Sequence, residues 1–133
     1  MTNRIFLIFC SVGLVPIALG YGAKPTVTLD AVFGITVDTI NLTHIMRAVM
    51  GLYIGMVVLW VWGAFSKSME GPALVACTVF MLGLAAGRIL SFVMDGLPHW
   101  LLIVYAVLEI VLGLIAFGLY RGNRSAGTSD SNS

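Results

Sequence analysis

The sequence predicts an all-α integral membrane protein, an antiparallel up-down bundle of four transmembrane helices. Of its 133 residues, 59% are hydrophobic and only 10% are charged, and the mean hydropathy is +1.03. A soluble domain usually carries about 25% charged residues, so this composition excludes one. The apolar residues gather in four stretches, each close to the roughly 20 residues that a helix needs to cross a bilayer. The net charge of +1 gives no reason to expect nucleic acid as a partner.

The first segment, residues 5–23, is expected to be a kinked helix. Pro16 lies inside it, and a proline in a helix interior removes one backbone hydrogen bond. A cleaved signal peptide is the alternative, because Arg4 precedes the apolar stretch and small residues at 20–23 resemble a cleavage site. Cleavage would leave three spans with the termini on opposite sides. The length of the apolar run favours a retained span.

The other three expected spans are residues 45–65, 73–94 and 100–120. Pro72 and Pro98 come just before the third and fourth, where a proline costs little because the first backbone donors of a helix are unpaired anyway. The connections 66–72 and 95–99 are short. Consecutive helices joined by such short loops must run antiparallel.

Two further parts of the chain are polar. The connection 24–43 is predicted to be an ordered cap over the bundle or a short element at the membrane interface, and the sequence leaves both open. The tail 122–133 is rich in Ser, Gly and Asn and is expected to be disordered and cytoplasmic. Residues 1–121 then make up one transmembrane domain.

The basic residues set the expected orientation, because cytoplasmic loops of membrane proteins carry an excess of Lys and Arg. With four spans, one side of the membrane receives only Lys24. The opposite side receives Arg4, Lys67, Arg121 and Arg124. Both termini are therefore expected in the cytoplasm.

Glu109 is the most unusual residue of the apolar segments. A carboxylate near the middle of a span costs several kcal/mol unless it is paired, neutralised or wetted. Arg88 on the third segment is its natural partner across an antiparallel hairpin. At a rise of about 1.5 Å per residue, Arg88 lies roughly 9 Å and Glu109 roughly 14 Å from the non-cytoplasmic end of its helix. Arg47 lies still closer to that end, so the charges gather in one half of the bilayer.

Helical spacing places other polar residues on the same faces. Ser91 and Asp95 follow Arg88 along one face of the third segment. Tyr105 and Glu109 share a face of the fourth. The sequence therefore predicts one polar pocket that opens to the non-cytoplasmic side. Its candidate ligand-binding residues are His44, Arg47, Arg88, Ser91, Asp95, Tyr105 and Glu109.

The function of this pocket stays open between several interpretations. Buried Arg–Glu pairs often serve only to fix helix register. A binding or accessory module would instead use Arg88 to anchor a small amphipathic or lipid-like ligand, or a partner subunit, with Glu109 as counter-charge or donor. The alternatives are a membrane enzyme with Glu109 as catalytic general acid/base and an oligomeric proton-coupled transporter. A homo-oligomer or a partner membrane protein is therefore among the expected partners, besides the bilayer itself.

Cysteine, histidine and tryptophan give weaker indications. Cys10 and Cys77 lie in apolar segments without a CxxC motif and are predicted to be buried free thiols. His44 and Asp95 are too few ligands to predict a metal site, and no cofactor is predicted. The tryptophans near span ends are expected at the membrane interface; they are Trp60, Trp62 and Trp100.

Two pairs of glycines are spaced four residues apart, Gly51 with Gly55 and Gly83 with Gly87. This spacing is typical of close packing between membrane helices. Because each helix must pack inside its own bundle, we expect these glycines to mediate contacts within the chain rather than dimerisation.

A resemblance to a known family follows from the spacing of the polar residues. The relevant residues are Asn41, His44, Arg47, Gly51, Leu52 and Tyr53, then Gly87, Arg88, Ser91, Asp95 and Gly96, and finally Glu109. This pattern resembles the DUF4345 family of small bacterial four-span membrane proteins of unknown function, over about residues 5–120. The resemblance implies four spans in a bacterial inner membrane and supplies no activity. The architecture is also similar, at fold level only, to that of DoxX-type four-helix membrane proteins. That family has been tied to redox and accessory roles.

Overall fold

The computed structural model describes residues 1–129, which form five α-helices and no strand. The helices are α1 (Thr2–Gly22), α2 (Pro25–Phe33), α3 (Ile40–Phe65), α4 (Lys67–Met94) and α5 (Trp100–Ser129). All except α2 are long and apolar enough to cross a membrane. The predicted all-α bundle with four spans is confirmed, and the chain is a multi-pass membrane protein.

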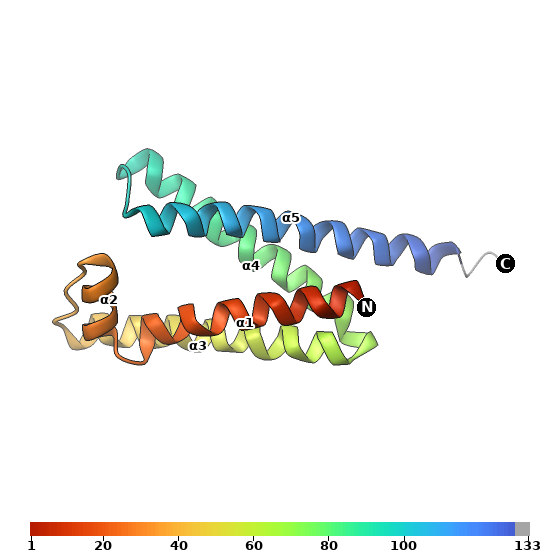
Figure 1. Ribbon diagram of the computed structural model, residues 1–133, viewed down its shortest axis with the longest axis horizontal. Coiled ribbons are helices and arrows are strands. Elements are labelled where there is room, and N and C mark those ends of the chain that lie inside the picture. The colour runs from red at the N-terminus through yellow and green to blue at the C-terminus, as the bar shows by residue number, and fades with distance from the viewer. Residues whose placement is uncertain (130–133) are drawn as a thin grey trace.

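The four long helices form two antiparallel pairs, α1 with α3 and α4 with α5 (Figure 1). The pairs meet through α3 and α4 at the end of the molecule that holds the N-terminus. They diverge toward the opposite end, where α2 lies (Figure 1). This divergence determines where the candidate site forms.

The connection between α1 and α3 is an ordered cap. Pro25 occupies the first position of α2, where its missing N–H costs nothing. Gly34 ends α2 with a φ of +67°, a left-handed conformation that glycine adopts without strain. The Thr39 side chain then accepts a hydrogen bond of 3.2 Å from the Leu42 N–H and starts α3. Leu29 on α2 is buried, so this helix packs onto the bundle.

Two helix boundaries differ from the sequence-based prediction. Only Ser66 separates α3 from α4, so the predicted connection 66–72 is mostly helical and Pro72 lies inside the helix. A proline there removes one bond, to the carbonyl of residue 68, close to the helix end where water can replace it. At the other end, α5 continues through residues 122–129, where a disordered tail was expected. Residues 130–133 of that tail lie outside the described part of the chain.

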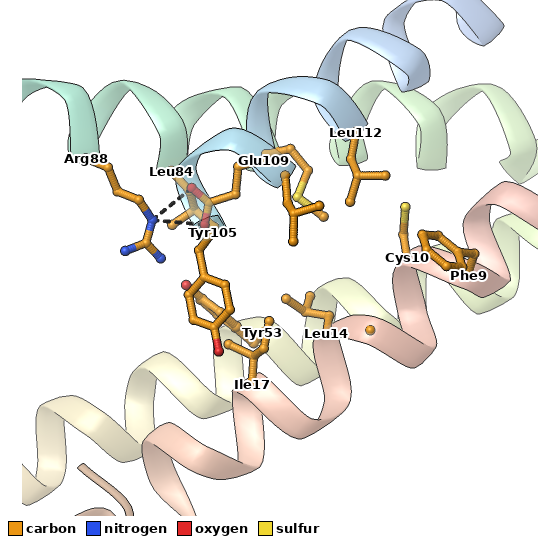
Figure 2. Close-up of a pocket in the computed structure, with 13 residues that line it drawn as sticks. Phe9, Cys10, Leu14, Ile17, Tyr53, Leu84, Arg88, Tyr105, Glu109 and Leu112 are labelled. Carbon is orange, nitrogen blue, oxygen red and sulfur yellow. Dashed lines mark hydrogen bonds and ion pairs between the residues drawn. The ribbon is translucent and has the colours of Figure 1, made fainter. Parts of the chain in front are cut away.

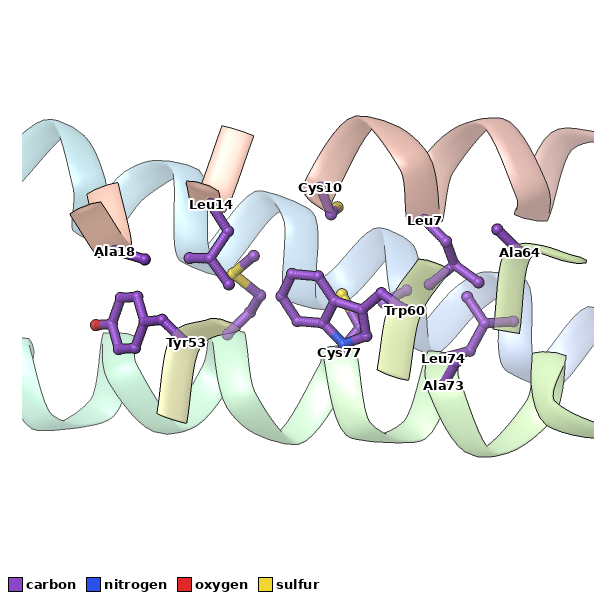
Figure 3. Close-up of a cluster of buried hydrophobic side chains, with 12 residues drawn as sticks. Leu7, Cys10, Leu14, Ala18, Tyr53, Trp60, Ala64, Ala73, Leu74 and Cys77 are labelled. Atoms are coloured by element: carbon purple, nitrogen blue, oxygen red, sulfur yellow. The ribbon is translucent and has the colours of Figure 1, made fainter. Parts of the chain in front are cut away.

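The core centres on Trp60, which is completely buried (Figure 3). Its ring stands edge-to-face against Phe80, with the centroids 5.7 Å apart. The prediction that Trp60 lies at the interface is therefore wrong, whereas Trp62 is 57% exposed. The two differ because residues two apart point in directions about 200° apart on a helix. Cys10 and Cys77 are free and buried in the same core, as predicted.

Close approaches between helices occur at glycines other than those predicted. A Cβ built on any of the paired glycines at 51, 55, 83 and 87 would meet nothing within 4 Å, so the prediction that they mediate packing within the chain is wrong. A Cβ on Gly63 would overlap the Cβ of Ala73 and lie 3.0 Å from the Met69 carbonyl oxygen. Gly22 makes a comparably tight contact with Met50 on α3. The absence of a side chain is needed at these two positions.

A polar clasp of Asn3, Glu70 and Asn123 joins α1, α4 and α5 at the end where the helix pairs meet. Asn3 Nδ2 donates to Glu70 Oε1 and, at 2.8 Å, to Asn123 Oδ1. Asn123 Nδ2 donates to the same Glu70 oxygen at 2.7 Å. The clasp holds three helices together at one end and leaves the other end free to diverge.

Glu70→Ala is expected to lower the free energy of unfolding by about 1 kcal/mol. Hydrogen bonds to a charged group contribute roughly 1.5–3 kcal/mol, and solvent weakens these partly exposed ones. Thermal unfolding in mild detergent measures the change, with Lys67→Ala, one turn earlier and exposed, as the matched control. Equal melting temperatures for the two variants would show that the clasp contributes nothing.

Candidate functional site

Arg88 and Glu109 form an ion pair inside the bundle. Arg88 Nε donates to both carboxylate oxygens of Glu109, at 3.1 and 2.9 Å. The antiparallel arrangement of α4 and α5 brings the two residues to the same level. Their side chains are 17% and 10% exposed. Each charge thus has a partner, and the loss of either residue would leave the other charge uncompensated inside the bundle.

The pair lies at one end of a cavity of about 160 Å³. The cavity is bounded by α1 on one side and by α4 and α5 on the other, with Tyr53 of α3 at its base (Figure 2). Leu14 and Ile17 of α1 face Leu84 of α4 and Leu112 of α5 across it. Apart from the polar end, the walls are almost entirely apolar.

Two tyrosines complete the polar end of the cavity. The ring of Tyr105 lies 5.7 Å from the guanidinium carbon of Arg88, within cation–π range. Tyr53 is 5% exposed and is held edge-to-face between Tyr21 and Phe80. Neither the Tyr53 nor the Tyr105 hydroxyl hydrogen-bonds to another residue of the described chain. Neither hydroxyl is therefore committed to another residue of the described chain.

The cavity opens sideways, toward the lipid, through residues on the outer faces of the helices. Phe9 on α1 and Leu108 on α5 line it and are 64% and 49% exposed. A second hollow, of about 220 Å³, shares Ile17 and Tyr105 with the first and continues beneath α2. Phe9 and Leu108 thus give the cavity an apolar, exposed edge.

The structure brings together only three of the seven candidate ligand-binding residues, Arg88, Tyr105 and Glu109. Farther along α4, Ser91 Oγ donates to Asp95 Oδ2 at 2.9 Å, and both residues are exposed. This pair does not line the cavity.

His44 and Arg47 lie in a different place again. Both are exposed at the start of α3 and line a shallow hollow with Asp38 and Thr43. The divergence of the helix pairs separates this hollow from Arg88. The candidate site is therefore smaller, and less positively charged, than the pocket expected from the sequence.

The wall contributed by α1 was not found by sequence reasoning. Cys10, Leu14 and Ile17 are apolar, and nothing in the sequence distinguishes an apolar cavity wall from a lipid-facing surface. Gly13 is the one signal, since it lines the cavity and a Cβ there would meet nothing within 4 Å. A glycine without a close neighbour leaves space in a bundle.

Comparison with known families agrees with the extent of the fold. A family model described as a domain of unknown function, DUF4345, matches residues 2–120. The match begins with α1 and includes most of α5, so it contains Arg88, Glu109 and the whole cavity. No curated protein and no solved structure matches the chain.

Proposed function

The chain belongs to the DUF4345 family, a domain of unknown function, and we propose that it is a binding module for a small amphipathic or lipid-like molecule. The molecule would occupy the cavity beside Arg88. The observation that supports this proposal is the combination of apolar walls with a single polar end, which matches an apolar guest that carries one polar group. A lateral opening to the lipid suits such a guest.

Binding explains the geometry better than the other interpretations. A pair that only fixed helix register would need no cavity beside it. A general base must be free to accept a proton from its substrate, whereas both oxygens of Glu109 receive the Arg88 Nε–H. Glu109 acts here as the counter-charge that keeps Arg88 in place. A partner subunit and oligomeric transport remain alternatives that the isolated chain does not favour.

We also propose a location in the bacterial inner membrane with both termini in the cytoplasm. The N-terminus, the α3–α4 connection and the later part of α5 lie at one end of the molecule (Figure 1). Arg4, Lys67 and Arg121 are at this end, and cytoplasmic ends are rich in such residues. The cavity then lies in the non-cytoplasmic half of the bilayer.

Native mass spectrometry of the purified protein in mild detergent tests the binding function. Wild type is expected to carry one small amphipathic or lipid-like molecule. Gly13→Leu is expected to lose it, because the added side chain occupies the cavity. Gly51→Leu is the matched control, since Gly51 is equally free of neighbours but does not line the cavity. Empty wild-type protein, or equal occupancy in all three proteins, would contradict the proposal.

A further inference from the structure

The charge of the site indicates the charge of its guest. Arg88 is the only basic residue among the described residues that line the cavity, and Glu109 already neutralises it. A carboxylate or phosphate would have to displace Glu109 or place a second negative charge beside the same guanidinium. Either outcome is unfavourable in an apolar surrounding, where charges interact strongly. The site therefore suits a neutral guest.

The volume and the aromatic walls indicate the shape of the guest. A cavity of about 160 Å³ is close to the roughly 150 Å³ of an engineered apolar cavity that binds benzene. It accepts one ring and is too small for the whole of a two-chain lipid. Tyr53, Tyr105 and Phe9 supply aromatic surface around it, and aromatic rings pack favourably against one another.

The polar groups at the end of the cavity are mainly donors. The Tyr53 and Tyr105 hydroxyls have no partner in the described chain, and the two terminal nitrogens of Arg88 take no part in the ion pair. A donor that a bound molecule shields from solvent costs free energy unless that molecule supplies an acceptor. A carbonyl oxygen is a neutral acceptor and satisfies such donors.

Taking these observations together, we infer that the guest is a neutral carbonyl-bearing ring on an apolar chain, the chemistry of a membrane quinone. The inference rests on the proposed binding function. The carbonyl faces Arg88 and Tyr53, the ring fills the cavity, and the chain leaves between Phe9 and Leu108 into the lipid.

Calorimetric titration of the full chain in detergent tests the inference with three probes of equal chain length: decylubiquinone, decanoate and 1-decanol. The quinone is expected to bind at least about tenfold more tightly than either other probe. Tyr53→Phe keeps the ring and removes the hydroxyl, so it should weaken quinone binding roughly tenfold, the effect of one net hydrogen bond. Tyr120→Phe, outside this cavity, is the matched control and should bind as wild type does.

The outcomes separate the guest from the function. Decanoate binding as tightly as the quinone would overturn the neutral-ring inference and leave the binding function intact. Equal quinone binding by wild type and Gly13→Leu would show partition into the micelle, and it would overturn the inference. No binding of any probe would also overturn it. The mass spectrum then decides the function, because a retained native molecule keeps that proposal and an empty cavity removes it.

Discussion

Glu109→Ala is expected to destabilise the protein by about 3–5 kcal/mol, because it leaves Arg88 buried without a counter-charge. The Arg88 side chain is 17% exposed, and Glu109 accepts both hydrogen bonds that the Arg88 Nε–H makes. Glu109→Gln keeps the size and one acceptor but removes the charge, so its loss should be intermediate. Thermal unfolding in detergent measures both variants.

The double variant Arg88→Leu with Glu109→Leu is the control for this prediction. Replacing a buried ion pair by apolar residues of similar volume is often neutral, so the double variant should unfold near the wild-type temperature while no longer offering a polar end to a guest. Equal losses of stability in Glu109→Ala and in the double variant would contradict the pairing. A Glu109→Ala variant as stable as wild type would show that Arg88 reaches water.

Gly63→Ala is expected to lower the free energy of unfolding by about 3 kcal/mol, at the upper end of the usual cost of overpacking. A Cβ at Gly63 would overlap the Cβ of Ala73, and neither atom can move without separating α3 from α4. Gly55→Ala on the same helix is the matched control, because its Cβ would meet nothing within 4 Å.

Thermal unfolding of these two glycine variants measures the difference directly. Since alanine favours helix more than glycine does, Gly55→Ala should be as stable as wild type or slightly more so. Equal stability of the Gly63→Ala and Gly55→Ala variants would mean that α3 and α4 do not approach closely at Gly63.

Sequence reasoning found the four spans and the Arg88–Glu109 pair because the membrane imposes both locally. A span must be long and apolar to satisfy its own backbone, and a charge inside it needs a partner wherever the helix packs. Hydropathy and the positions of the charges carry this information without any knowledge of tertiary structure.

The same reasoning did not show which apolar face packs against protein. Lipid is as apolar as a leucine side chain, so hydrophobicity does not distinguish the interior of a membrane bundle from its surface. Trp60 and Trp62 look equivalent in sequence, yet only Trp60 is buried. Gly51 and Gly55 match a packing motif that this fold leaves without neighbours, whereas the isolated Gly63 is where two helices meet.

The separation of His44 and Arg47 from Arg88 has a related cause. The sequence predicts a similar depth for these residues, but depth alone does not fix lateral position. The helix pairs diverge at that end and α2 covers it (Figure 1), so residues at similar depth belong to different hollows.

A crystal structure of the protein, from crystals grown in a lipid phase after purification without added ligand, would show directly whether the cavity holds a molecule. We expect density for one ring-sized molecule in the cavity, in contact with Arg88 and the Tyr53 hydroxyl, with its chain passing Phe9 toward the lipid. A collapsed cavity, with α1 packed directly against the Arg88–Glu109 pair, would contradict the proposed binding function.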